Sequence, residues 1–405
     1  MAQDAERRYY LKTLNNDVRQ KTENRLAWLR RAVVVGFIAG LLLSLKLWVS
    51  TREYPLTPLW DLVPPTPYPA DYLLFGLFVA LLVGVAVVSA RSVAAGWLAL
   101  AATLLAAFFV LQDQSRLQPW FYQYSFMIAA FCFYGWGWIG VEGVSNACRL
   151  IVAAIYFWSG LQKANASFVE TGFSLLIIPL TTRLPDEILP YVEPMLLWSA
   201  YAVPVIEAAI GLGFLTRRFR KAAVIGALLM HTFILLCVGP LGLDYNSVVW
   251  PWNIAMVAFA FILFWRPPDD PSPLTILRSG RSFSLGSTFR AAVLVLFAFM
   301  PLLSFFGLWD CYLSSSLYSY NTKEGYILVP KGSGWEQISL VNVSLEEMNV
   351  PPYPEERVIR NVFAKRWCEE GDSSEPLLYL SDRPGILSGE RSSKIYSCND
   401  ARRAS

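Results

Sequence analysis

The chain has 405 residues, of which 55% are hydrophobic and 16% charged, and its mean hydropathy is +0.40. The charged share lies well below the roughly 25% typical of soluble domains, so the composition excludes an ordinary soluble protein and favours a polytopic membrane protein. The net charge of +3 requires no nucleic-acid partner, and the single histidine, His231, excludes any metal site built on two or more histidines.

The chain begins with a charged leader, residues 1–31, which we expect to form a helix near the membrane surface. No small-residue cleavage site follows the first apolar run, so that run is interpreted as a signal anchor. Residues 32–308 are predicted to form a helical membrane body. A helix needs about 20 apolar residues to cross a bilayer, and the apolar runs predict nine spans: 32–50, 72–90, 92–111, 121–144, 150–163, 195–215, 222–238, 249–265 and 291–308.

Lys and Arg are distributed unevenly between the two sides of these spans. With the leader inside, the inner segments include the basic stretches at 217–221 and 266–290. The outer loops hold far fewer basic residues, namely Arg52, Arg116, Lys163 and Arg183. Because cytoplasmic loops are enriched in Lys and Arg, the N-terminus is predicted to be cytoplasmic and the C-terminal region periplasmic or lumenal.

Polar side chains inside a span are costly, so each is a candidate functional residue. The first group lies in "DQSRLQPWFYQY", where Gln114, Gln118 and Gln123 cluster near the outer start of the fourth predicted span. Within this group we take Tyr122 and Gln123 as candidate binding residues.

The stretch "YFWSGLQKANASF" (156–168) places Gln162 and Lys163 at the outer end of an apolar run. Lys163 is either an interfacial anchor, with its stem in lipid and its ammonium in water, or a catalytic base. Burial disfavours the charged form of a lysine, which is how such a residue becomes a base near neutral pH. It would then take a proton from a membrane-soluble quinol, with Gln162 or Asn253 stabilising the oxyanion.

Five further candidates lie in later spans. Glu207 either supports the site or pairs with a basic residue or a backbone group between helices. His231 either shuttles protons or packs as a hydrogen-bonded residue. Trp250 and Trp252 form either an aromatic belt or a platform for ring stacking. Together with Asn253, these residues are predicted to converge on the outer half of the bundle, where an amphipathic substrate and a lipid-soluble cofactor could meet.

Residues 309–405 are polar and predict a small α+β domain outside the membrane. The runs 326–329 and 338–343 are β-like, and 355–370 has apolar residues near helical spacing. An oxidising compartment permits a disulfide among the outer cysteines, which are Cys311, Cys368 and Cys398. Pairing cannot be deduced from sequence alone, and we favour Cys368 with Cys398.

The segment "IYFWSGLQKANASFVETGFSL" (155–175) resembles the Y-F-x-x-G-x-x-K stretch of the vitamin K-dependent gamma-glutamyl carboxylase family. That family belongs to the wider horizontally transferred transmembrane (HTTM) group. "DQSRLQPWFYQYSF" and "MHTFILLCVGPLG" look like its neighbouring helices. "VIEAAIGLGFLTRRFRKAA" (205–223) is similar to quinone-linked membrane proteins of the DoxX and MauE type.

The resemblance implies a quinol cofactor similar to vitamin K hydroquinone. In the carboxylases a membrane lysine deprotonates the hydroquinone, oxygen adds, and the resulting strong base removes a proton from substrate glutamate for attack on carbon dioxide. Lys163 matches the position of that lysine. Two differences favour a simpler quinol reaction or a binding role. The family's histidine ahead of the lysine has no counterpart in 133–143, and the outer domain is far shorter.

The sequence therefore predicts an all-α polytopic membrane bundle of about nine transmembrane helices with a small C-terminal α+β extramembrane domain. The leading functional hypothesis is a carboxylase-like, quinol-binding membrane oxidoreductase or lyase, with Lys163 and His231 as catalytic residues. The expected binding residues are Gln162, Glu207, Trp250, Trp252, Asn253, Tyr122 and Gln123. The alternative is a non-catalytic membrane partner or maturation factor of the DoxX or MauE type, which docks another protein through the outer domain. A transporter fits less well, because no inverted repeat is evident.

Overall fold

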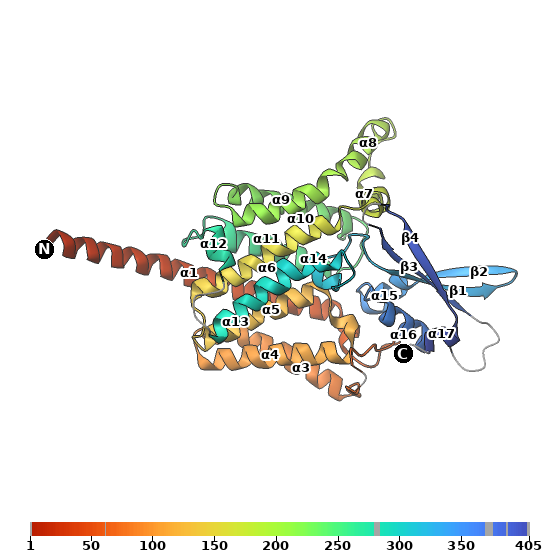
Figure 1. Ribbon diagram of the computed structural model, residues 1–405, viewed down its shortest axis with the longest axis horizontal. Coiled ribbons are helices and arrows are strands. Elements are labelled where there is room, and N and C mark those ends of the chain that lie inside the picture. Colours follow the sequence, from red (N-terminus) through yellow and green to blue (C-terminus); the bar gives the residue numbers. More distant parts are fainter. Residues whose placement is uncertain (1, 61, 279–283, 369–375, 386–387, 403–405) are drawn as a thin grey trace.

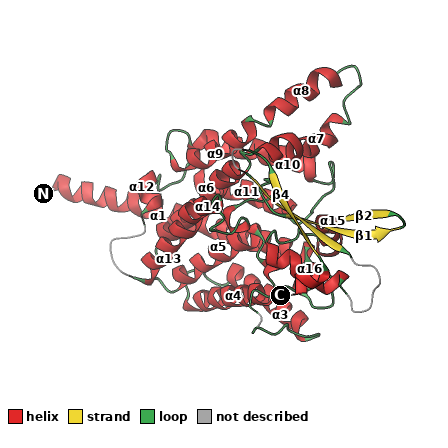
Figure 2. Cartoon of the chain, turned by 45° about the vertical axis from the view of Figure 1, so that its right-hand side comes forward, coloured by secondary structure: helices red, strands yellow, loops and turns green. Residues whose placement is uncertain are grey.

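Most of the chain is helical, and the strands are confined to one end of the molecule (Figure 2). The computed structural model describes residues 2–60, 62–278, 284–368, 376–385 and 388–402, with side chains from residue 16 onward. The helices form a bundle with the sheet at one end, and helix α1 (Ala2–Leu43) projects from the other (Figure 1). We call these the outer-domain end and the leader end.

The described residues include six helical segments that are long and apolar enough to cross a membrane. They are Asn16–Leu43 of α1, α3 (Ala70–Val87), α4 (Val93–Gln112), α6 (Val141–Gln162), α10 (Arg220–Val238) and Leu285–Ser304. The last segment comprises α13 (Leu285–Val293), η3 (Leu294–Phe299) and α14 (Met300–Ser304). The length and composition of these segments indicate a multi-pass membrane protein.

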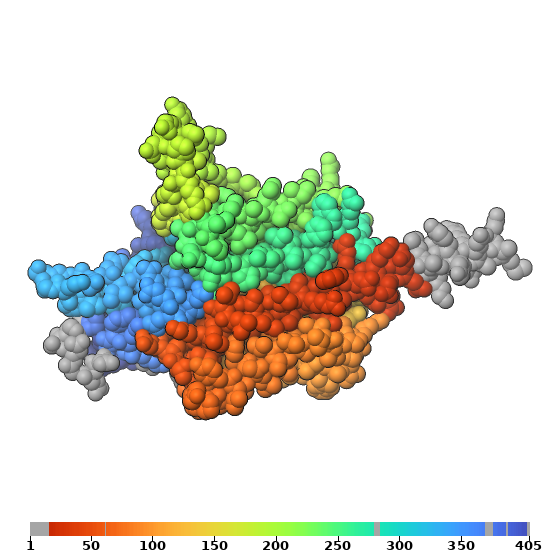
Figure 3. Space-filling view, turned by 180° about the vertical axis from the view of Figure 1, so that it is seen from behind, coloured from red at the N-terminus to blue at the C-terminus, as the bar shows by residue number. Residues whose placement is uncertain are grey.

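A further candidate span is bent. Helices α8 (Leu189–Ser199) and α9 (Ala202–Leu215) satisfy the same test only as a pair, and they are bent by 47° at the break between them. Helix α8 projects from the bundle together with α7 (Phe173–Thr181), as Figures 1 and 3 show in yellow-green. The predicted span 195–215 is therefore not one straight helix.

The nine predicted spans are not confirmed, and the clearest difference concerns 121–144 and 150–163. Helix α5 (Pro119–Gly135) ends before a turn at 136–140, in which Gly137 adopts a positive φ of 74°. Glycine adopts such a φ without steric cost, so this turn separates two helices within an apolar stretch. Because α6 begins directly after the turn, the predicted boundary between these two spans is wrong.

Several shorter helices complete the bundle. They are α2 (Leu45–Trp48), η1 (Gln114–Arg116), η2 (Phe168–Gly172), α11 (Val249–Phe264) and α12 (Pro273–Leu277). At 1.5 Å per residue, the 16 residues of α11 rise about 24 Å, less than the roughly 30 Å of a hydrocarbon core. The predicted span 249–265 is therefore a shorter apolar helix.

The leader is helical, as predicted, but it is not a separate surface helix. Helix α1 continues without a break from Ala2 to Leu43. The sequence of 1–35 contains neither glycine nor proline, so nothing in it favours ending the helix before the first span.

The outer domain consists of a sheet and short helices. Its described strands form an antiparallel sheet in the order β2-β1-β3-β4. They are β1 (Glu324–Lys331), β2 (Gly334–Ser339), β3 (Leu377–Pro384) and β4 (Arg391–Tyr396). The helices are η4 (Tyr312–Ser314), α15 (Leu340–Met348), α16 (Glu356–Trp367) and α17 (Cys398–Arg402). A small α+β domain therefore follows the bundle.

The predicted strand at 338–343 is divided between two elements. Strand β2 ends at Ser339, and α15 begins at the next residue. Leu340, Ser344 and Met348 are buried along α15 at a spacing of four residues, which is helical rather than alternating. The prediction of a strand over this whole run is therefore wrong.

The predicted disulfide partners meet in the outer domain. Cys368 follows α16 and Cys398 opens α17, and the structure joins the two in a disulfide with a Cα–Cα distance of 5.4 Å. The domain also contacts the bundle end directly. Arg383 donates to the Ser304 carbonyl at 2.8 Å, and Asn321 donates to the Gln162 amide oxygen at 2.7 Å.

Helices α6 and α9 cross very closely, and this crossing builds the site described below. A Cβ added at Gly160 would lie 2.5 Å from the Ala208 backbone nitrogen, and one added at Gly211 would lie 2.6 Å from the Ala153 carbonyl oxygen. Small residues allow such close approach between membrane helices. The crossing therefore depends on the absence of side chains at these two positions.

Candidate functional site

A cavity of about 440 Å³ lies between α6, α7, α9, α10 and α11. Its walls are mainly apolar and aromatic, and several chemically active side chains share them. The polar lining residues on the helices are Ser159, Lys163, Glu207, His231 and Asn253. Tyr318 and Tyr320, from the segment that enters the outer domain, also line it. Five of the sequence-predicted residues thus meet at one cavity: Lys163, Glu207, His231, Trp252 and Asn253.

Lys163 is paired within the protein. It caps the C-terminus of α6, and its Nζ donates to Ser159 Oγ at 2.6 Å and to Glu207 Oε2 at 2.8 Å. The Lys163 and Glu207 side chains are only 12% and 8% exposed. An interfacial anchor extends its ammonium into water, whereas this ammonium is held against a carboxylate at the cavity wall.

The Lys163–Glu207 pair has an energetic consequence. Desolvation opposes burial of each charge, and the mutual attraction offsets that cost only while both partners are present. The sequence left open whether Glu207 supports the site or pairs with a basic residue. The structure shows the pairing, and the basic partner is Lys163.

His231 lies in a chain of three side chains. Tyr156 Oη lies 2.6 Å from His231 Nε2, and Asn253 Oδ1 lies 2.6 Å from His231 Nδ1. Asn253 Nδ2 donates to the Val249 carbonyl, which fixes the amide so that its oxygen faces the imidazole. His231 Nδ1–H therefore donates to Asn253, and Nε2 accepts the Tyr156 hydroxyl proton. In this arrangement the imidazole carries its single proton on Nδ1.

Trp252 and Gln123 form a second layer behind the cavity. Trp252 lines the cavity, and its Nε1 donates to Gln123 Oε1 at 2.8 Å. Gln123 is fully buried, and its Nε2 contacts Met256 Sδ at 3.2 Å. Gln123 therefore positions the indole ring and does not line the cavity.

Three other predicted residues do not line the cavity either. Gln162 donates to Ser304 Oγ at 2.7 Å and accepts from the outer domain, so it ties the bundle to that domain. Tyr122 stacks on Phe297 with ring centroids 4.7 Å apart. Trp250 Nε1 donates to a backbone carbonyl of α10 at 3.0 Å. These contacts assign packing roles to all three.

Sequence reasoning missed part of the lining. Ser159 lies one helical turn before Lys163, so the i, i+4 spacing could have identified it. Tyr156 is the first residue of the Y-F-x-x-G-x-x-K stretch, so that motif could have identified it. Tyr318 and Tyr320 come from a segment with positive φ values, 56° and 54°, and no sequence pattern predicts their return to the bundle.

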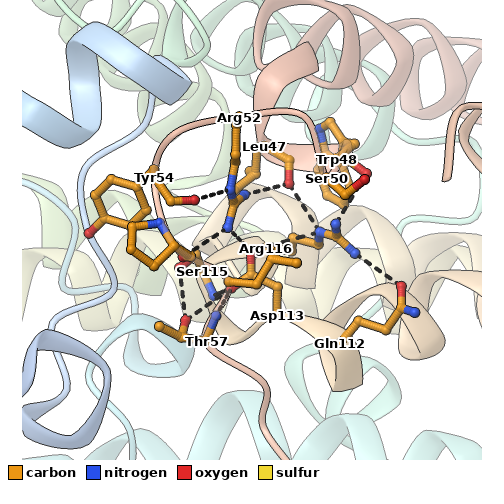
Figure 4. Close-up of polar contacts among 12 residues, drawn as sticks. Leu47, Trp48, Ser50, Arg52, Tyr54, Thr57, Gln112, Asp113, Ser115 and Arg116 are labelled. Carbon is orange, nitrogen blue, oxygen red and sulfur yellow. Dashed lines mark hydrogen bonds and ion pairs between the residues drawn. The ribbon is translucent and has the colours of Figure 1, made fainter. Parts of the chain in front are cut away.

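A separate buried polar cluster lies between the first span and η1 (Figure 4). Asp113 accepts from Arg52 Nη2 at 2.5 Å, and Arg116 Nε lies 3.9 Å away. Thr57 and Ser115 also donate to Asp113 Oδ1. Burial disfavours the carboxylate, but the charges of Arg52 and Arg116 outweigh it and hold the pKa of Asp113 below its usual value.

This cluster is structural in character. The arginines also donate to backbone carbonyls, including those of Leu47 and Trp48, so the cluster fixes the chain just after the first span. Gln114, which the sequence grouped with the candidate site, lies at this cluster instead and accepts from Arg357 of the outer domain.

In the part of the chain that the structure describes, no group of three or more His, Cys, Asp or Glu residues is arranged to hold a metal ion. No protein-family model, characterised protein or solved structure matches the chain. The resemblance of 155–175 to the carboxylases therefore rests on the motif residues alone.

Proposed function

We propose that this membrane protein binds a quinol-type ring in the cavity and accepts a hydroxyl proton on the Lys163–Glu207 pair. The observation that carries the proposal is this ion pair in the wall of a mainly apolar cavity within the bundle. The resemblance of 155–175 to the vitamin K-dependent carboxylases supports the same role for Lys163. A carboxylase-like, HTTM-type identity is part of the proposal.

The lining fits an amphipathic ring. Ligand cavities typically measure about 300–1,000 Å³ and combine apolar walls with a few polar groups, and this cavity of about 440 Å³ does so. Phe173, Trp252 and Tyr320 offer aromatic faces, while Lys163 and Glu207 supply the polar groups. When bound, a quinol would supply two hydroxyl protons and, with dioxygen as the oxidant, two electrons.

The ion pair can receive one of those protons. Two of the three Lys163 N–H groups donate to Ser159 and Glu207, and Glu207 Oε1 accepts no hydrogen bond from a described residue. Moving one ammonium proton from Nζ to Oε2 across 2.8 Å leaves a neutral amine. The amine then accepts the hydroxyl proton and becomes an ammonium again.

His231 supports a second proton step. Tyr156 donates to His231 Nε2, so the tyrosine oxygen keeps lone pairs that can accept from a ligand hydroxyl at the cavity wall. Asn253 holds the imidazole in the tautomer that accepts from Tyr156. His231 therefore orients Tyr156 and can relay its proton.

Photoaffinity labelling of the purified full-length protein tests the binding step. A photoreactive quinone analogue, reduced to its quinol, should label peptides from α6, α10 and α11, and excess unlabelled quinol should prevent this labelling. Labelling spread over the lipid-facing surfaces of α3 and α4, with no effect of the competitor, would contradict the proposal.

A second candidate function is a non-catalytic membrane partner that docks a protein through the outer domain. The observation that favours it is the β1–β2 hairpin, which projects beyond the rest of the domain (Figures 1 and 2). Trp335 on this hairpin is 55% exposed. Failure of the wild-type protein to bind quinol, together with a co-purifying protein that Trp335→Ser releases, would favour this candidate.

A further inference from the structure

A second cavity lies at the leader end of the bundle, away from the site described above. It measures about 930 Å³ and is bounded by α1, α12, the start of α13 and the turn that opens α6. Helices α6 and α13, which both contribute to membrane-spanning segments, begin at this cavity. Its position therefore corresponds to the headgroup layer of one leaflet.

The charges around this cavity are mostly positive. Among the described residues, the charged lining consists of Arg19, Arg91, Arg278, Arg290 and one carboxylate, Glu142. Arg19 and Arg91 both contact Glu23, at 3.1 and 3.4 Å. Arg278 and Arg290 form no ion pair with a described residue, so the cavity retains an excess of positive charge.

Backbone donors add to this charge. Helix α6 begins at Gly140 with no side-chain cap, and residues 140–143 line the cavity. The first turn of a helix leaves its N–H groups without intrahelical partners and carries the positive end of the helix dipole. Arg290 Nη2 reaches only the Thr275 carbonyl, at 3.3 Å. The Arg290 guanidinium and these N–H groups therefore offer donors to one anion.

The surroundings of the cavity are apolar. Trp138 and Leu274 line it and are 46% and 78% exposed, and Leu285, between two lining residues, is 59% exposed. A free anion gains nothing from these side chains, whereas acyl chains can cover them. Basic pockets between membrane helices are suited to anionic lipid headgroups.

We propose that this cavity binds the phosphate group of an anionic phospholipid, with Arg278 and Arg290 as its main side-chain contacts. The phosphate occupies the space between the two guanidinium groups and the first turn of α6. The acyl chains lie along Trp138, Leu274 and Leu285. Glu142, the carboxylate among the described lining residues, opposes the anion.

Native mass spectrometry of the full-length protein tests the proposal. Detergent-solubilised wild type is offered phosphatidylglycerol and phosphatidylcholine at equal concentration, and we expect it to retain one phosphatidylglycerol with a clear preference. Arg290→Gln and Arg278→Gln should each lower retention by about tenfold, because each removes a charge-assisted hydrogen bond to phosphate. Arg278 is exposed, so its variant keeps the test valid if Arg290→Gln fails to fold.

The matched control is Arg217→Gln. Arg217 lies near the same end of the bundle, is exposed and pairs with Asp270, but does not line the cavity. It should retain the lipid as wild type does. Equal retention of phosphatidylcholine by wild type, or unchanged lipid retention in both Arg278→Gln and Arg290→Gln, would overturn the proposal.

A second experiment distinguishes binding of a lipid from binding of a free anion. Inorganic phosphate or glycerol 3-phosphate, added at millimolar concentration, should leave the bound phosphatidylglycerol in place, because neither contacts the apolar surroundings. Displacement of the lipid by these soluble anions, with the same dependence on Arg290, would show that the site binds free phosphate and would overturn the lipid assignment.

Discussion

Two buried ion pairs in this protein differ in what surrounds them. Asp113 is fully buried among Arg52, Arg116, Thr57 and Ser115, and both of its oxygens accept hydrogen bonds. The Lys163–Glu207 pair lies at a cavity wall and leaves one carboxylate oxygen unbonded by the described residues. A fully satisfied pair stabilises the fold, whereas a pair that keeps free acceptors beside a cavity is suited to chemistry.

Asp113→Ala tests the structural role. The substitution leaves Arg52 and Arg116 buried without their carboxylate, and breaking a buried pair typically costs about 3 to 5 kcal/mol. We expect a large fall in the thermal unfolding temperature of the detergent-solubilised protein. Glu53→Ala removes an exposed carboxylate next to Arg52 and serves as the control. Equal unfolding temperatures for the two variants would contradict the role assigned to Asp113.

At the residue scale, the cost of placing a polar side chain in a membrane helix is the sequence signal that predicts the candidate site. It identified Lys163, Glu207, His231 and Asn253, which the structure brings to one cavity. The same signal misplaced Gln162, because a helix end presents neighbouring residues to different surroundings. Sequence spacing alone does not determine the rotation of a helix about its axis, which decides between cavity and domain contact.

At the element scale, the crossing of α6 and α9 positions the site. Gly160→Val would place a branched side chain where even a Cβ lies 2.5 Å from the Ala208 backbone nitrogen. Overpacking of this kind typically costs about 1 to 3 kcal/mol, and separating the helices would also lengthen the Lys163–Glu207 contact. We expect lower thermal stability and lost quinol binding.

The control for Gly160→Val is a glycine in an open position. A Cβ at Gly76 in α3 would meet nothing within 4 Å, so Gly76→Val should preserve stability and binding. Wild-type behaviour of Gly160→Val would show that α6 and α9 do not need this close approach.

Helix α16 and the sheet of the outer domain meet at Glu356. Burial raises the pKa of this carboxyl group, but hydrogen bonds from Tyr396 and Lys323 outweigh that effect and lower the pKa to about 2. A depressed pKa contributes stability above the ordinary value of 4.5, and this contribution is lost as the pH falls through about 2. Because Glu356 is partly exposed, we expect only about 1 kcal/mol.

The measurement is the difference in unfolding temperature between wild type and Glu356→Gln. It should be present at pH 7 and shrink as the pH falls from about 4.5 towards 2, since protonation makes the two side chains alike. A difference that is constant from pH 7 to pH 2.5 would mean that the charge of Glu356 does not stabilise the domain.

The elements were predictable to different degrees. Long apolar runs such as α3 and α4 were found close to their true bounds, because length and composition determine them. The division between α5 and α6 was not, because aromatic and apolar residues continue through the turn at 136–140. The run 338–343 contains β-branched residues, which favour a strand. Residues 340–343 are helical instead because Leu340, Ser344 and Met348 pack on one buried face of α15.

At the scale of the whole molecule, the two ends of the bundle are expected on opposite sides of the membrane. The turn between α9 and α10 and the outer domain lie at different ends (Figure 1). Reporter fusions after Lys221 and after Ser405 should therefore report opposite compartments, with Lys221 on the cytoplasmic side. The same compartment at both points would contradict the arrangement of the spans.

A helical bundle followed by a small α+β domain could be predicted from the whole sequence, whereas the number of spans could not, and the orientation in the membrane stays a prediction. Hydropathy finds apolar runs but does not distinguish a crossing helix from a short or bent one. Helices α8 and α9, with their 47° bend, and the 16-residue α11 are such cases. Helices α9 and α11 both line the cavity.

Oxygen-dependent oxidation of added quinol by the purified protein, compared between wild type and Lys163→Arg, tests the central claim most directly. Arginine keeps the positive charge beside Glu207 but cannot give up its proton, so it can replace an anchor and not a base. Lys163→Arg and Lys163→Ala should both lose turnover by about 100-fold or more, whereas the exposed-site control Glu170→Gln should not. Full turnover in Lys163→Arg would contradict the assignment of Lys163 as the proton acceptor.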